Sequence, residues 1–79
     1  MNYRECWEKG KRTLAEKGIE EAELDARLLL EHVCGTNRND LLVHGDREVL
    51  PEQEAAYLSL TGRRGERIPL QYLTGGQEF

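Results

Sequence analysis

Apolar residues recur along this chain with the spacing of α-helices, and no stretch of useful length alternates every second residue as a β-strand would. The first predicted helix begins at Asn2, because Asn2 and Glu5 have the spacing of a capping box. Its inward stripe is predicted to be Tyr3, Trp7, Gly10 and Leu14. A second helix is predicted from about residue 20 to residue 33, and its apolar stripe is Ala22, Ala26, Leu29, Leu30 and Val33.

Three further amphipathic segments follow. Asn37 can cap a short helix that runs to His44, and Pro51 suits the first position of a helix that runs to about Arg64. The buried stripe of this longer helix is predicted to be Ala56, Tyr57 and Leu60. Pro69 can begin a last turn and a half of helix. The glycines predicted to end the first four helices are Gly18, Gly35, Gly45 and Gly65, with Gly45 in the left-handed conformation. The pattern therefore predicts an all-α fold, a small bundle of four to five helices.

Composition and length agree with one soluble domain. The chain has 79 residues, of which 38% are hydrophobic and 33% charged, and this balance is typical of a globular protein. The N-terminus has no apolar core of a signal peptide, and no stretch approaches the roughly 18 apolar residues of a membrane span. We therefore expect a cytoplasmic protein without a membrane partner. No coiled-coil seam is visible, so a monomer is expected.

The charges are unevenly distributed. A formal net charge of −4 argues against a general nucleic-acid binder, and the segment from 16 to 31 is strongly acidic. This acidity also argues against a helix-turn-helix DNA reader built from the second and third helices. In contrast, Arg63, Arg64 and Arg67 form a basic cluster. These arginines either bind an acidic partner or a nucleic acid, or they complement the dipole at the end of their own helix.

Asp25 lies between Ala22 and Ala26 on the apolar stripe of the second helix. An unpaired carboxylate on a buried stripe is costly, so Asp25 is predicted to have a cationic partner. Arg64 is the first candidate for a structural ion pair with Asp25, and Arg67 is the second. The alternative is that Asp25 lies on a solvated face.

No catalytic, cofactor or metal site is predicted. A phosphate loop follows a strand, whereas Gly62, Gly65, Gly75 and Gly76 follow predicted helices and are expected to be helix stops. The possible metal ligands His32, Cys34 and His44 lack the short spacing of a zinc site. The two cysteines, Cys6 and Cys34, lack a CxxC spacing and are predicted to be buried, unpaired residues.

Three stretches together resemble a known family. They are "AELDARLLLEHVCG" (22–35), "LLVHGD" (41–46) and "RIPLQYLTGGQEF" (67–79), and the last is the most specific. They resemble the N-terminal domain of the HemK family, the bacterial release-factor glutamine methyltransferases, over essentially the whole chain. The resemblance implies a helical N-terminal domain at residues 1–76, and at 77–79 the start of a linker to a methyltransferase domain absent from this sequence.

The resemblance also implies a function. Members of that family use S-adenosylmethionine to methylate the glutamine of the Gly-Gly-Gln motif in peptide chain release factors, which act in translation termination. The family's catalytic pattern has an Asn-Pro-Pro-Tyr motif, which binds the substrate glutamine amide, and a Gly-rich cofactor loop. Neither occurs here, and the two prolines, Pro51 and Pro69, are not adjacent. We therefore expect the 79 residues alone to bind no methyl donor and to be inactive. Their expected role is to recognise the protein substrate.

By this resemblance, Arg63 and Arg67 are expected to contact the release factor, because they lie next to the linker. Packing against the chain's own methyltransferase domain is expected of Leu70, Tyr72 and Phe79. The alternative is a self-standing helical interaction module that binds a partner helix through the apolar residues of the tail. A coding sequence that continues into a Gly-rich strand-loop-helix would favour the methyltransferase.

Overall fold

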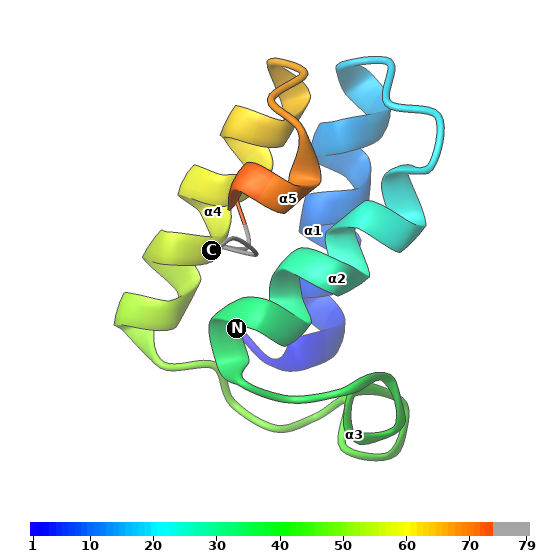
Figure 1. The fold of residues 1–79 in the computed structure, drawn as a ribbon. Helices are drawn as coiled ribbons and strands as arrows, with labels where there is room; N and C mark the ends of the chain where they lie inside the picture. The colour runs from blue at the N-terminus through cyan, green and yellow to red at the C-terminus, as the bar shows by residue number, and fades with distance from the viewer. Residues whose placement is uncertain (74–79) are drawn as a thin grey trace.

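A computed structural model of the chain describes residues 1–73, which form five α-helices (Figure 1). The helices are α1 (Tyr3–Glu16), α2 (Ala22–Cys34), α3 (Arg38–Val43), α4 (Pro51–Gly65) and α5 (Leu70–Leu73). Extended pairing within residues 1–73 is limited to an isolated antiparallel bridge between Asn2 and Glu48. The predicted all-α bundle is confirmed. The predicted linker at 77–79 lies outside the described residues.

Helices α1, α2 and α4 form the body of the molecule, and each packs against the other two. The short helix α3 lies at one end of this body, at the bottom of Figure 1, whereas the connection from α4 to α5 lies at the opposite end. Two clusters of buried side chains fill the space between the long helices, and Trp7 packs against both. Within residues 1–73, no helix combines the length and the apolar character that a bilayer span requires.

Local signals account for most helix ends. The Asn2 side chain accepts a hydrogen bond from the Glu5 amide at 2.8 Å, and the Asn2 amide donates to the Glu5 side chain at 2.9 Å. The capping box at the start of α1 is therefore confirmed. Gly18 and Gly35 have φ angles of 81° and 63°, and they end α1 and α2 as predicted. Asn37 caps α3 by accepting from the Asp40 amide at 2.8 Å.

Two glycines do not have the predicted roles. Gly45 is not left-handed; it is buried, and its carbonyl accepts a hydrogen bond from the Arg4 amide at 2.9 Å. An added Cβ atom at Gly45 would lie 3.1 Å from the Arg4 guanidinium and 3.4 Å from the Leu41 carbonyl oxygen, so a side chain there would require small shifts of these neighbours. Gly62 was expected to stop a helix, but it lies inside α4. That prediction was wrong because packing of the flanking residues keeps the helix intact across one glycine.

The buried face of α4 differs from the predicted stripe. Ala56 is exposed, and the buried residues are Tyr57, Thr61 and Gly65, which recur every four positions. The hydroxyl of Tyr57 crosses the core above Gly10 of α1 and donates a hydrogen bond to the Ala26 carbonyl of α2 at 3.1 Å. This ring therefore joins the three long helices, and its position sets the rotation of α4.

The two cysteines are unpaired, as predicted. Cys6 is fully buried, and burial raises the pKa of its thiol to about 11. Cys34 is half-buried, and burial also raises the pKa of its thiol. Both side chains therefore remain neutral at physiological pH and contribute to the core as small apolar groups.

Candidate functional site

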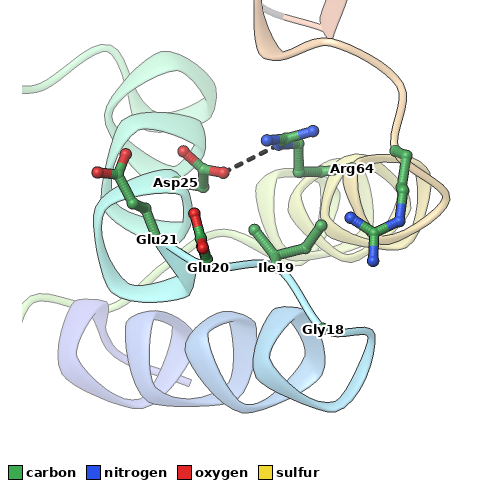
Figure 2. A pocket seen from close by; sticks show the side chains of 7 residues that line it. Gly18, Ile19, Glu20, Glu21, Asp25 and Arg64 are labelled. Carbon is green, nitrogen blue, oxygen red and sulfur yellow. Dashed lines mark hydrogen bonds and ion pairs between the residues drawn. The ribbon is translucent and has the colours of Figure 1, made fainter.

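Asp25 and Arg64, which were predicted from the sequence to pair, form an ion pair in the structure. Arg64, in the last turns of α4, donates from Nε to Oδ2 of Asp25 in α2 at 2.9 Å (Figure 2). The same guanidinium donates from Nη1 to the Ile68 carbonyl at 3.3 Å. Asp25 is buried, and the Arg64 side chain is 23% exposed. Arg64 thus links α2, α4 and the segment that leads to α5.

A hollow of about 380 Å³ lies beside this ion pair. The connection between α1 and α2, the start of α2 and the end of α4 surround it (Figure 2). Its lining residues are Gly18, Ile19, Glu20, Glu21, Asp25, Arg64 and Arg67. We call it the Arg67 hollow. Its charges are mixed, with three carboxylates and two guanidinium groups, so it is suited to polar contacts with a protein surface more than to a multiply charged anion.

Arg67 has a strained backbone. Its φ angle is 71°, and it is the one non-glycine residue among positions 1–73 with positive φ. The left-handed region costs a residue with a Cβ atom roughly 1–2 kcal/mol. α4 ends at Gly65, within one residue of the predicted end at about Arg64, and a left-handed residue follows at Arg67. An added Cβ at Gly18 would lie 3.3 Å from the Arg67 guanidinium, so the strained residue covers the end of α1.

Arg67→Gly is expected to stabilise the fold by about 0.5–1 kcal/mol, because glycine removes the strain but also makes the unfolded chain more flexible. Urea unfolding followed by circular dichroism measures this change. Arg63→Gly is the control, since Arg63 lies within α4 and glycine should destabilise it there. A loss of stability in Arg67→Gly would contradict the account of strain.

Arg63 lies at a different hollow, of about 500 Å³, between the end of α2, α4 and α5. His32 and Leu73 line the same hollow. The cluster of three arginines predicted from the sequence is therefore divided: Arg64 binds Asp25, while Arg63 and Arg67 line separate hollows. Both Arg63 and Arg67 are exposed and available for contact with another molecule.

The residues expected to pack between domains differ in exposure. Leu70 is half-buried against the core, whereas Tyr72 is 72% exposed. Phe79 lies outside the described residues. Tyr72 thus presents an aromatic side chain on α5 to any neighbouring surface.

Metal ligation has no support in the geometry of residues 1–73, which contain no group of three or more His, Cys, Asp or Glu side chains arranged to hold an ion. His44 follows α3, and its Nε2 lies 3.8 Å from a carboxylate oxygen of Asp40. Thr36 and Arg47 also contact that carboxyl group. The cluster at Asp40 is therefore a local structural network.

Sequence reasoning missed a groove between α1, α2 and α3. Leu41 is buried, but its neighbours on α3, Leu42 and Val43, are 58% and 63% exposed. A usable signal was present, because a six-residue helix cannot bury three consecutive apolar residues on one face. Leu42 lines two hollows that adjoin Trp7.

Comparison with known proteins assigns the chain to a family. The profile of the PrmC N-terminal domain matches residues 5–75, which span all five helices. This chain belongs to the PrmC N-terminal domain family. Its similarity to curated proteins agrees, because the relatives carry the name of the methyltransferase family that the sequence resembles.

Three of these relatives are each named release factor glutamine methyltransferase. The protein of Deinococcus radiodurans is 42% identical over 79 residues, which cover 100% of this chain and 28% of the relative. That of Geobacter sulfurreducens is 45% identical over 73 residues, covering 92% of this chain and 25% of the relative. That of Bordetella pertussis is 46% identical over 66 residues, covering 84% and 24%. The chain thus spans about a quarter of the length of these relatives. No solved structure gives a significant match.

Proposed function

We propose that this PrmC N-terminal domain recognises peptide chain release factors for an S-adenosylmethionine-dependent methyltransferase that modifies the glutamine of their Gly-Gly-Gln motif. The observation that carries the proposal is the family match over residues 5–75. The names and lengths of the relatives support a catalytic domain in the remainder of a longer parent protein. The methyl donor and the glutamine amide would bind that remainder, because the 79 residues contain neither the family's Gly-rich cofactor loop nor its Asn-Pro-Pro-Tyr motif. Translation termination takes place in the cytoplasm, and we therefore propose a cytoplasmic location for this function.

A rigid helical domain can contribute to such a reaction without touching the reacting atoms. The enzyme must select one glutamine amide among many, and contacts far from that amide supply binding free energy that holds it in register. The Tyr57 hydroxyl bond to Ala26 and the Asp25–Arg64 ion pair hold the long helices in one arrangement. Surface residues of the domain are therefore presented to a protein substrate in a fixed geometry.

Arg63 and Arg67 are the proposed contacts from the α4 end of the domain. Both guanidinium groups are exposed, and Arg67 retains a strained backbone that glycine would relieve. Strain that persists at a surface residue is consistent with a functional role for its side chain. The alternative for Arg63, which lies in the last turn of α4, is that it only complements the helix dipole.

Charge reversal tests this assignment in the full-length parent protein. The double variant Arg63→Glu/Arg67→Glu is expected to raise the KM for an intact release factor about tenfold with kcat nearly unchanged, because the lost contacts are remote from the chemistry. Lys9→Glu is the matched control, since Lys9 is an exposed cation on α1 that lines none of the hollows described above. An unchanged KM would refute the role of these two arginines.

Direct titration tests the wider proposal. The 79-residue chain is expected to bind an intact release factor in calorimetry and to give no signal with S-adenosylmethionine. Methylation of a release factor by the chain alone, or tight binding of the methyl donor, would overturn the proposed division of roles.

A further inference from the structure

A second surface lies where α1, α2 and α3 meet. Two adjoining hollows of about 400 and 330 Å³ are found there, and both are lined by Trp7, Glu23 and Leu42. We call this surface the Trp7 groove. Its lining residues come from α1, the first two turns of α2, and α3 with the turn that follows it. The groove shares no lining residue with the Arg67 hollow, although both border the first turn of α2.

The groove has an apolar centre held in a fixed position. Trp7 is half-buried against both core clusters, and its indole N–H donates a hydrogen bond to the Glu23 carbonyl at 3.2 Å. The exposed side chains of Leu24 and Leu42 line the groove beside it. A tryptophan whose orientation is already fixed, flanked by exposed leucines, is typical of the sites that carry most of the free energy in protein–protein binding.

The edge of the groove is cationic although the whole chain is acidic. Its two hollows are lined by four cations, which are Arg4, Lys11, Arg27 and Arg38. The two anions are Glu8 and Glu23. Lys11 lies 3.4 Å from Glu8, and Arg27 lies 3.7 Å from Glu31. Arg4 and Arg38 form no ion pair with any residue of 1–73, so two guanidinium groups remain available for carboxylates of a partner.

We propose that the Trp7 groove binds a short acidic segment of the release factor that carries one apolar anchor side chain. This inference rests on the proposed function. The anchor contacts Trp7 and Leu42, and carboxylates on the same segment bind Arg4 and Arg38. The cations favour an acidic segment and also accelerate its association, since complementary charge steers the encounter.

Two other occupants fit the groove less well. A nucleic acid would leave the exposed leucines without partners and would bring phosphates close to Glu8 and Glu23. A second copy of this chain, docked symmetrically, would bring two cationic edges face to face, and like charges across an interface are unfavourable. A short peptide can place its carboxylates at Arg4 and Arg38 and its apolar side chain at Trp7 and Leu42, without bringing a charge close to Glu8 or Glu23.

The single tryptophan of the chain provides a direct measurement. Incorporation of 5-fluorotryptophan gives one ¹⁹F resonance, from position 7, and titration with an intact release factor should shift or broaden it. Arg38→Glu and Leu42→Asp are each expected to weaken binding about tenfold. Both residues are exposed, so these variants should keep the fold, and circular dichroism checks this.

Matched controls separate the groove from general surface effects. Val43→Asp places the same charge on the neighbouring residue of α3, which is equally exposed and lines neither hollow. Lys9→Glu removes a cation of α1 that also lies outside the groove. Both control variants are expected to bind release factor as the unmodified chain does.

The outcomes are distinguishable. If the chain binds release factor but Arg38→Glu and Leu42→Asp bind equally well, the groove proposal is wrong and the proposed function stands. If the unmodified chain does not bind release factor, both are wrong. A ¹⁹F shift that arises only with added RNA, or only on raising the concentration of the chain itself, would assign the groove to nucleic acid or to a second copy and would overturn the proposal.

Discussion

Gly10→Ala is expected to lower the free energy of unfolding by about 3 kcal/mol. A Cβ atom at position 10 would lie 2.0 Å from the Tyr57 hydroxyl oxygen and 2.7 Å from the ring carbon that bears it. Tyr57 cannot move aside easily, because it is fully buried and donates to the Ala26 carbonyl. Either the ring shifts and that buried hydrogen bond is lost, or α1 moves away from α4.

Urea unfolding, followed by circular dichroism and by Trp7 fluorescence, measures the loss. Gly62→Ala is the matched control: no atom lies within 4 Å of an added Cβ there, and Gly62 is inside α4. That variant is expected to gain up to about 1 kcal/mol, because alanine favours helix over glycine. Similar effects of the two substitutions would show that contact with Tyr57 does not explain Gly10.

Arg64→Ala is expected to cost about 2–3 kcal/mol. The substitution leaves the buried Asp25 carboxylate without its 2.9 Å partner and the Ile68 carbonyl without its donor. Removing one member of a buried ion pair usually costs about 3–5 kcal/mol. The expected value is lower here because the Arg64 side chain is 23% exposed and water can reach the carboxylate once the arginine is gone.

Arg63→Ala is the natural control, because Arg63 is the adjacent arginine of α4 and lies exposed. Its effect is expected to stay within about 0.5 kcal/mol. The double variant Asp25→Ala/Arg64→Ala should cost less than the sum of the two single variants, since it leaves no unpaired buried charge. Equal losses for Arg63→Ala and Arg64→Ala would contradict a structural role for the ion pair.

The ion pair also matters for the proposed function, because Asp25 and Arg64 both line the Arg67 hollow. Arg64 holds the segment after α4 through the Ile68 carbonyl, next to the left-handed turn at Arg67. We therefore expect Arg64→Ala to weaken release factor binding indirectly, by loosening the backbone that carries Arg67. The Trp7 groove shares no lining residue with the Arg67 hollow, so binding there should be unaffected.

The ion pair at the centre of this site could be predicted from the sequence by one argument. A carboxylate on a buried helix face requires a cation, and Arg64 continues the inward face of another predicted helix, so the Asp25–Arg64 pair could be inferred without coordinates. The Arg67 strain could not be inferred in this way. Gly65 offered the usual helix stop, whereas the left-handed residue is Arg67, two positions later.

The sequence by itself determined the helices, because their starts and ends depend on residues within about four positions of one another. Asn2 with Glu5, Asn37 with Asp40, and Gly35 are signals of this kind. Only the tertiary structure shows why Gly10 lacks a side chain and which residues surround Trp7. These features arise from atoms that are distant in sequence and close in space, and close packing, which no local pattern encodes, brings them together.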